Sequence, residues 1–227
     1  FSRERLSQTE ALLREEQIKS LTLEKHTLET RLRLLQAQIE PHFLFNTLSN
    51  VLSLLESDPA RGKAMLEDLT RYLRSSLSRT RDRMTTLGQE IDLVRAYLDI
   101  CKVRMEERLR YTIEVPDKLR DMSFPPMLVQ PFVENAIRHG LLPSDNPGRL
   151  ILRISQTASH LLITVADNGI GLDKAAELNS KSALRYISRG KELTLKRISL
   201  LNKLGFRIEV QTESSNSGTT ITISMAL

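Results

Sequence analysis

Residues 125–140 read PPMLVQPFVENAIRHG, and this stretch decides how the second half of the chain is interpreted. Two prolines open it, a glycine closes it, and its apolar residues are spaced as on one side of a helix. Near its end an acid, an amide and two basic side chains fall within about one turn: Glu134, Asn135, Arg138 and His139. Carboxylate and amide oxygens suit Mg²⁺ beside phosphates, and an arginine can neutralise phosphate charge. Two interpretations stay open, a site for such a ligand or a surface helix with solvated charges.

The rest of the second half alternates between helix and strand signals. A helix is expected over about residues 127–138, where Gly140 stops it. Alternating runs rich in β-branched residues predict strands at residues 111–115, 150–155, 161–166, 206–212 and 219–225. A further helix is expected at residues 193–204 and is closed by Gly205. Helices and strands that alternate over roughly 120 residues predict an α/β layer domain with its own core.

A second motif, DNGIG at residues 167–171, comes directly after a predicted strand. Gly169 and Gly171 allow the backbone to come close to a ligand. A carboxylate at a strand end, here Asp167, can accept a hydrogen bond from an exocyclic amine such as that of adenine. Turns of this composition are common, but the position of this one, shortly after the Asn135 helix, favours a shared site.

The first half is helical in composition. Residues 2–55 hold no glycine and a single proline, Pro41. Apolar residues recur at heptad spacing before Pro41, which predicts a parallel coiled coil with a second copy of the chain. Asp58 and Pro59 are a typical N-cap and first helical residue, so a second helix is expected to follow, and a third helical run opens at residues 86–88. Two antiparallel helices per chain, doubled, predict a dimeric four-helix bundle.

The stretch QIEPHFLFN, residues 38–46, lies within this helical half. The upstream heptad places His42 in the apolar seam, whereas the downstream register places it on a polar face. The apolar stripe of that downstream register is Leu44, Leu48, Val51 and Leu55, and its polar face is Asn46, Ser49 and Ser53. Pro41 removes one backbone donor and crowds the preceding turn, so we expect a bend or a change of register there. A histidine exposed beside a packed bundle can act as a nucleophile or as an acid and base, although a lone histidine in a helix is usually structural.

Composition excludes several other classes of protein. The formal net charge is +5 and the sequence pI is about 9.5, but acids and bases alternate and no Lys/Arg block has the length of a nucleic-acid patch. The one cysteine, Cys101, allows no internal disulfide and no thiolate metal cluster. The sequence contains no signal peptide and no run of ~20 apolar residues. Because no long block of Lys and Arg is present, we expect no nucleic-acid partner.

Together these stretches resemble the LytS-like family of sensor histidine kinases, and the resemblance covers nearly everything from Leu35 onward. QIEPHFLFN resembles the phosphoacceptor box of that family, and PPMLVQPFVENAIRHG resembles its N box. DNGIG resembles the first glycine box of the Bergerat ATP-binding fold, which histidine kinases share with type II topoisomerases and related chaperones. The expected fold class is therefore α plus α/β: a coiled-coil helix and a dimeric four-helix bundle, then a Bergerat-fold α/β sandwich whose mixed sheet is covered by helices.

The resemblance implies a role for each motif. His42 would take the γ-phosphoryl group of ATP as a phosphoramidate, and we take Glu134 and Glu40 as further candidate catalytic residues. Glu40 stands where the family commonly has asparagine, and it would either orient the imidazole or be solvated. By the same resemblance Asn135 would coordinate Mg²⁺, Arg138 and His139 would lie near the phosphates, and Asp167 would hold adenine. The candidate cofactor-binding residues are Asn135, Arg138, His139, Asp167, Gly169, Gly171 and Lys191.

One part departs from the family pattern. The second glycine box, G-x-G-L-x-N, corresponds to residues 190–195, where Glu192 replaces the second glycine and Leu195 the asparagine. A backbone nest for phosphate needs the freedom of glycine, and Glu192 would repel a triphosphate unless it points away. Lys191 and neighbouring basic residues supply charge from this lid. The alternative function is a pseudokinase that acts as a dimeric interaction module with weak or no ATP turnover, and a second alternative is a stand-alone ATPase.

The sequence thus predicts the cytoplasmic portion of a homodimeric two-component sensor histidine kinase that uses ATP and Mg²⁺. The predicted domains are a coiled-coil signalling helix at residues 1–40, a dimerisation and histidine phosphotransfer hairpin at 41–86 and an ATP-binding catalytic domain at 87–227. The resemblance implies transfer of the phosphoryl group to an aspartate of a response regulator receiver domain. It also implies attachment to the cytoplasmic side of the inner membrane through segments upstream of residue 1.

Overall fold

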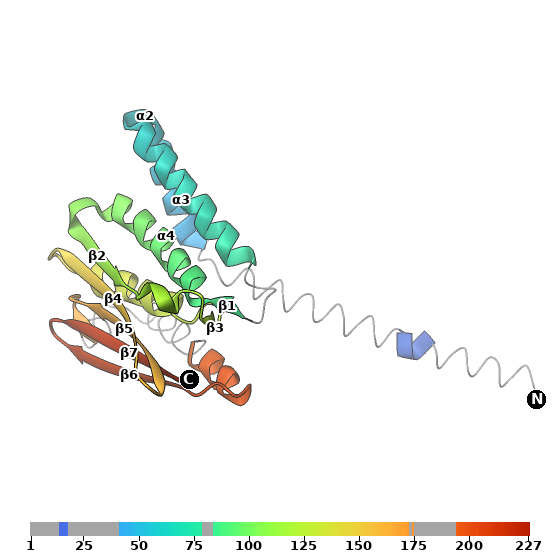
Figure 1. Ribbon diagram of the computed structural model, residues 1–227. Helices are drawn as coiled ribbons and strands as arrows, with labels where there is room; N and C mark the ends of the chain where they lie inside the picture. Colours follow the sequence, from blue (N-terminus) through green and yellow to red (C-terminus); the bar gives the residue numbers. More distant parts are fainter. Residues whose placement is uncertain (1–13, 18–40, 79–83, 173, 175–193) are drawn as a thin grey trace, which may run out of the picture. The chain divides into compact units, whose positions relative to one another are not determined.

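The computed structural model describes residues 14–17, 41–78, 84–172, 174 and 194–227 (Figure 1). The chain divides into two compact units, Phe1–Asn46 and Thr47–Leu227. Apart from one helical turn at residues 14–17, the predicted coiled coil lies outside the described residues. The division into three domains at residues 40 and 86 stays a prediction. Within the described residues, no helix is both long and apolar enough to cross a membrane.

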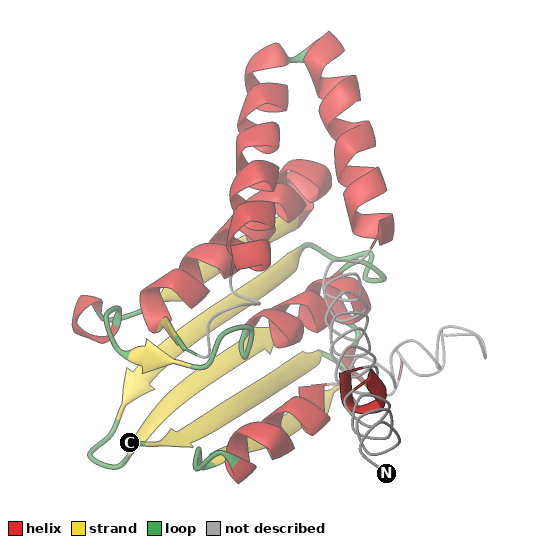
Figure 2. Cartoon of the chain, turned by 90° about the vertical axis from the view of Figure 1, so that its right-hand side faces the viewer, coloured by secondary structure: helices red, strands yellow, loops and turns green. Residues whose placement is uncertain are grey.

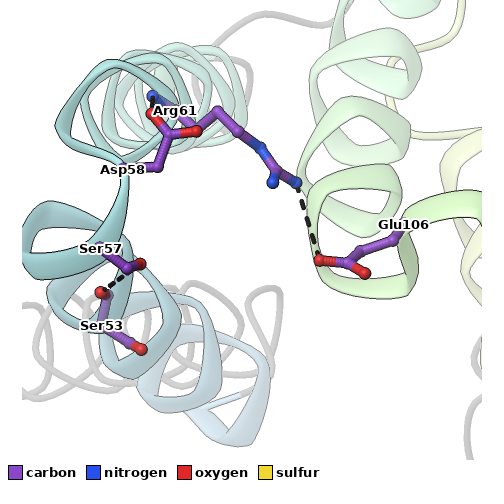
Figure 3. A network of polar contacts seen from close by, with 5 residues as sticks. All are labelled: Ser53, Ser57, Asp58, Arg61 and Glu106. Atoms are coloured by element: carbon purple, nitrogen blue, oxygen red, sulfur yellow. Dashed lines mark hydrogen bonds and ion pairs between the residues drawn. The ribbon is translucent and has the colours of Figure 1, made fainter.

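Two helices, α2 (Pro41–Ser57) and α3 (Pro59–Ser78), are joined by a tight turn at Asp58. The backbone N–H of Arg61 donates to Oδ1 of Asp58 at 3.2 Å, and Pro59 is the first residue of α3, so the predicted cap is confirmed. Figure 3 shows this turn beside the ion pair between Arg61 and Glu106, whose atoms lie 3.9 Å apart. Because both partners are exposed, that pair adds at most about 1 kcal/mol.

The helix α3 packs against α4 (Leu87–Met105). Met65, Leu69 and Tyr72 of α3 are buried, and their spacing places them on one face of the helix. Burial of each such side chain stabilises the fold by about 1.5–3 kcal/mol. The start of α4 agrees with the expected helical run, since Thr86 and Gln89 form a capping box with both hydrogen bonds at 3.2 Å.

The apolar stripe predicted for α2 is buried only in part within the single chain, and its packing in a dimer stays a prediction. Val51 is buried, but Leu48 and Leu55 are 44% and 42% exposed, and the polar Thr47 is buried instead. Packing in the described unit selects the face of Thr47 and Val51, while the leucines one residue further along point outward. The periodicity of α2 alone cannot decide between these faces, because both carry apolar residues.

A five-stranded sheet forms the core of the second unit, in the order β2-β4-β5-β7-β6. Its strands are β2 (Leu109–Glu114), β4 (Gly148–Gln156), β5 (His160–Asp167), β6 (Ile208–Ser215) and β7 (Gly218–Ala226). Only β2 and β4 run parallel among these neighbours, and the other pairs are antiparallel. All five strands predicted from the sequence are present. The two-residue strands β1 (Thr85–Thr86) and β3 (Ser123–Phe124) form a separate small pair that the sequence did not reveal.

One face of this sheet is apolar and covered by helices. Figure 2 shows the strands behind α4, the short helices near residues 130–141 and the helix at residues 194–203. The residues that point to the covered face are fully or almost fully buried: Leu150, Leu152, Ile154, Leu161, Ile163, Val165, Ile223 and Met225. Alternate residues such as Arg149 and Arg153 are exposed on the other face. The mixed α/β sandwich predicted from the sequence is therefore confirmed.

Candidate active site

The segment that leads into the N-box helix is held by a buried carboxylate. Glu90 of α4 has no exposed surface, and its two oxygens accept backbone N–H bonds from Met127 at 2.9 Å, Val129 at 3.0 Å and Gln130 at 3.4 Å. Met127 adopts a positive φ of 59°, a left-handed conformation that is unfavourable for a side chain of this size. Glu90 therefore holds a strained turn and satisfies donors at the start of the helix.

The same turn is attached to the helix that follows the candidate lid. The guanidinium of Arg197, in the helix at residues 194–203, donates through Nη2 to the carbonyl oxygen of Pro126. Burial lowers the pKa of Arg197, and the nearby charge of Glu90 raises it. Neither Glu90 nor Arg197 belongs to a motif recognised in the sequence. No sequence signal identifies them, because their partners are 37 to 71 residues away.

The helix predicted for residues 127–138 begins later than expected, changes type and runs past Gly140. The α-helix α5 spans Gln130–Asn135, and it continues as the π-helix η3, Ala136–Leu141. The bond from the Leu142 N–H to the Ile137 carbonyl, at 2.8 Å, marks the wider turn. The residues before Gln130 are bonded to Glu90 rather than to a helical turn, so the predicted start was wrong. A π-turn is rare and frequently lies at a functional site, and this one carries Arg138 and His139.

The N box and the DNGIG loop are in direct contact. The N–H of Ile170 donates to the carbonyl oxygen of Gly140 at 3.1 Å. A β-carbon on Gly169 would lie 2.3 Å from the carbonyl carbon of Gly140, and one on Gly140 would lie 2.7 Å from Oδ1 of Asp167. Only glycine fits at either position without displacing a neighbour. The two motifs, which lie far apart in the sequence, thus build one site.

Asp167 is the acidic centre of this site. Its Oδ1 accepts the N–H of Gly169 at 2.9 Å, and it also accepts a backbone bond from Thr219. Burial raises the pKa of Asp167, and these two hydrogen bonds oppose that rise. Sequence reasoning placed Thr219 at the start of a strand but gave it no role. It lies opposite Asp167 in the β5–β7 pairing, which only the sheet register reveals.

The other residues of the DNGIG loop hold its shape. The amide of Asn168 accepts from the N–H of Arg149 at 2.5 Å and donates to the carbonyl oxygen of Pro147 at 3.0 Å. Gly171 has φ 75°, and a β-carbon there would lie 1.9 Å from the Ser215 carbonyl oxygen. Asn168 and Gly171 thus fix the loop between β4 and β6, while Asp167 and Gly169 line the contact with Gly140.

The four candidate residues near the end of the N box, Glu134, Asn135, Arg138 and His139, occupy half-buried positions. Burial, aided by the neighbouring charge of Arg138, lowers the pKa of His139 to about 4, so its imidazole is neutral at neutral pH. A neutral imidazole brings a hydrogen-bond donor and an acceptor to the site but no charge. Glu134 accepts hydrogen bonds at Oε1 from Tyr72 at 3.2 Å and from Gln130 at 2.8 Å. Asn135 is the last residue of α5.

The structure does not relate the remaining predicted residues to this site. His42 occupies the second position of α2 and belongs to the other compact unit. Its helical register continues in Ser49 and Ser53, which are exposed as the predicted polar face requires. Glu40, Lys191 and Glu192 lie outside the described residues, as does the predicted bend before Pro41. Leu195 is described and lies half exposed in the helix at residues 194–203.

Comparison with known proteins identifies the class to which this fold and site belong. The model of the family "Histidine kinase" matches residues 30–109, and that of the family "Histidine kinase-, DNA gyrase B-, and HSP90-like ATPase" matches residues 121–227. The class is therefore that of the histidine kinases, with an ATPase domain of the Bergerat type. A solved histidine kinase domain of a blue-light activated kinase from Erythrobacter litoralis is 17% identical, covers 88% of this chain and 95% of that one, and has a TM-score of 0.47.

Two curated relatives make the assignment narrower. The sensor protein LytS of Oceanobacillus iheyensis is 32% identical over 197 residues, 85% of this chain and 34% of that protein. The sensor histidine kinase/phosphatase LytS of Staphylococcus aureus is 33% identical over 195 residues, 85% of this chain and 33% of that protein. This chain belongs to the LytS-like family of sensor histidine kinases. It spans about a third of the length of the curated relatives it matches.

Proposed function

We propose that this chain binds ATP with Mg²⁺ at the site around Asp167 and transfers the γ-phosphoryl group to His42. The observation that carries the proposal is the contact of Gly140 with Asp167 and Gly169, where a single β-carbon would close the space beside the carboxylate. The half-buried carboxylate of Asp167 lies at the end of β5, beside the backbone of Gly140 and Gly169, which carry no side chains. A carboxylate can accept from the exocyclic amine of adenine, and glycine lets the flat ring come close to the backbone.

Each remaining candidate residue takes a role around that ligand. The amide of Asn135 supplies one oxygen to Mg²⁺, because this ion usually binds through few protein ligands and the phosphates of a substrate. Arg138 offsets phosphate charge, and the neutral His139 contributes a hydrogen bond. We assign Lys191 to the charge of the lid and Gly169 and Gly171 to the loop beside the nucleotide.

The chemical step is a displacement at phosphorus. A ring nitrogen of His42 bonds to the γ-phosphorus while the bond from that phosphorus to the bridging oxygen breaks, and ADP leaves with the electron pair. Bound Mg²⁺ would offset the negative charge that develops on the phosphate oxygens. The imidazole must be neutral to attack, and Glu134 and Glu40 are the carboxylates that we assign to orienting it or accepting its proton.

We further propose that the chain works as a homodimer. Leu48, Leu52 and Leu55 recur at helical spacing on α2 and are 44%, 67% and 42% exposed, and Leu66 on α3 is 42% exposed. A contiguous apolar helix face of this kind is typical of an interface. A second copy that covers it would complete the four-helix bundle.

Three further proposals concern the longer protein of which this chain would be a part. Since this chain spans about a third of its relatives, three statements rest on the family alone: transfer to an aspartate of a response regulator, attachment to a membrane and location on its cytoplasmic side. The first can be tested with a purified receiver domain, to which the label should pass from phosphorylated chain.

The central experiment is incubation with ATP labelled in the γ-phosphate, together with Mg²⁺. Label should appear on the protein, should be lost in acid and kept in base, and should vanish in His42→Gln. The matched control is His160→Gln, which removes an exposed histidine at the start of β5 and should leave labelling unchanged. A folded protein without label would overturn the kinase proposal in favour of an interaction module. Hydrolysis of ATP without protein label would indicate a stand-alone ATPase.

A further inference from the structure

A buried polar cluster connects the helical hairpin to the N box. Tyr72 of α3 is 2% exposed, and its hydroxyl donates to Oε1 of Glu134 in α5 at 3.2 Å. The amide Nε2 of Gln130, which has no exposed surface, donates to the same oxygen at 2.8 Å. Two donors from two different helices therefore converge on a single carboxylate oxygen.

The hydroxyl of Tyr72 stays protonated and can therefore always donate a hydrogen bond. Burial and the adjacent charge of Glu134 raise the pKa of Tyr72 well above its ordinary value, so the hydroxyl keeps its proton at any pH at which the protein works. The ring of Tyr72 also packs near that of Tyr97 in α4, with 5.9 Å between ring centroids. Its position is thus fixed by packing as well as by the hydrogen bond.

The orientation of Gln130 follows from the same contact. Its Nε2 must face Glu134, because an amide oxygen in that place would oppose a carboxylate oxygen. Its Oε1 is buried, and the described part of the chain offers it no hydrogen-bond partner. Leaving a buried acceptor unpaired is unfavourable. The side-chain amide of Gln130 keeps this orientation nevertheless, so its hydrogen bond to Glu134 must outweigh that cost.

This cluster lies next to the residue assigned to Mg²⁺. Glu134 directly precedes Asn135, and both belong to a helix of six residues whose start is held by Glu90. Even with η3, into which it continues, this helical segment ends at Leu141, and a helix of this length is only marginally stable on its own. Its placement depends on bonds to neighbouring elements, and Tyr72 of α3 supplies one of them.

We propose that Tyr72 is a positioning residue for the nucleotide site: together with Gln130 it fixes the Glu134 carboxylate and thereby the helix that carries Asn135. The inference rests on the proposed function for its link to ATP. Under this proposal the affinity for nucleotide depends on how α3 packs against α4 and α5. By thermodynamic reciprocity, bound nucleotide must in turn stabilise the packing of α3 against α4 and α5.

The test compares Tyr72→Phe, which removes only the hydroxyl, with Tyr111→Phe. Tyr111 also donates its hydroxyl to a carboxylate, that of Asp99, but links α4 to β2 rather than to α5. We expect Tyr72→Phe to raise the Kd and the KM for Mg²⁺–ATP by about three- to tenfold. Tyr111→Phe should change neither constant. Equal ATP affinity of Tyr72→Phe and the wild-type chain would overturn the proposal.

Two further measurements separate positioning from general destabilisation. In a Glu134→Met background the substitution Tyr72→Phe should have no further effect on ATP affinity, because the acceptor is already gone. Additive effects in this cycle would contradict the proposal.

Hydrogen exchange tests the same contact without nucleotide. Backbone amides of residues 132–135 should exchange faster in Tyr72→Phe than in Tyr111→Phe, and unchanged exchange would overturn the inference. If the wild-type chain bound no ATP, the proposed function would fail, but this exchange comparison would still decide whether Tyr72 positions α5.

Discussion

A β-carbon on Gly140 would lie 2.7 Å from Oδ1 of Asp167, so the end of the N box has no room for a side chain beside the carboxylate of the DNGIG loop. The nearest obstacle to a larger residue at 140 is thus the end of a side chain that can rotate. At residue 169 the obstacle is the backbone of Gly140 itself, at 2.3 Å. The two glycines therefore respond differently to the same substitution.

We expect Gly140→Ala to fold but to lose nucleotide binding, because the new methyl group displaces the Asp167 carboxylate. Gly169→Ala should instead destabilise the fold by about 3 kcal/mol, since backbone atoms must move. Denaturant unfolding and calorimetric titration with ATP separate the two outcomes. Gly148→Ala, whose β-carbon would meet its nearest atoms at 3.3 Å, is the control: it should leave the ATP affinity unchanged and cost less stability than Gly169→Ala. Nucleotide binding by Gly140→Ala at wild-type affinity would refute this account.

Acidification should weaken the fold through His139. Its folded-state pKa is about 4, below the ordinary value of 6.5, so between these pH values the unfolded chain binds more protons than the folded one. The free energy of unfolding should therefore fall as the pH drops from 6.5 toward 4. His139→Gln should reduce this pH dependence, whereas His160→Gln, at an exposed position, should leave it in place. Identical pH profiles for wild type and His139→Gln would show that His139 is not the group responsible.

Removal of the Glu90 carboxylate should be strongly destabilising. Glu90→Ala leaves the buried N–H groups of Met127, Val129 and Gln130 without their acceptor, and we expect a loss of about 3–5 kcal/mol in the free energy of unfolding. Asp92→Asn is the matched control in the same helix. Its exposed ion pair with Arg120, at 2.8 Å, should contribute less than about 1 kcal/mol. Equal losses in the two variants would mean that Glu90 does not hold the turn.

A charge on the outward face of α2 should disrupt self-association. Leu52 is 67% exposed, and Leu52→Glu would place a carboxylate in the interface proposed for a second copy. Sedimentation velocity should detect a dimer for the wild-type chain and a monomer for this variant. Leu200→Glu, at a leucine that is 61% exposed in the helix at residues 194–203, should remain dimeric. A wild-type monomer at micromolar concentration would count against the proposed bundle.

The strands and most helix boundaries could be predicted because they depend on local patterns. Alternation of apolar residues located β4 and β5, and Asp58 with Pro59 marked the start of α3. The N-box helix was mispredicted at both ends for non-local reasons. Its first residues bond to Glu90 of another helix, and its last turn widens into a π-helix beside β5. The sequence did not reveal that Thr47 and Val51 face the rest of the chain while Leu48 and Leu52 point outward, because apolar residues lie on both faces of α2.

The sequence by itself determined the family, the order of helices and strands, and the candidate residues His42, Asn135 and Asp167, since these follow from spacing along the chain. Only the tertiary structure decided that Gly140 touches Asp167, that Thr219 lies opposite it and that Tyr72 reaches Glu134. The physical reason is that each of these contacts joins elements far apart in sequence. Their distances are fixed by the register of the sheet and by helix packing. The identity of these partners produces no repeating pattern in the sequence.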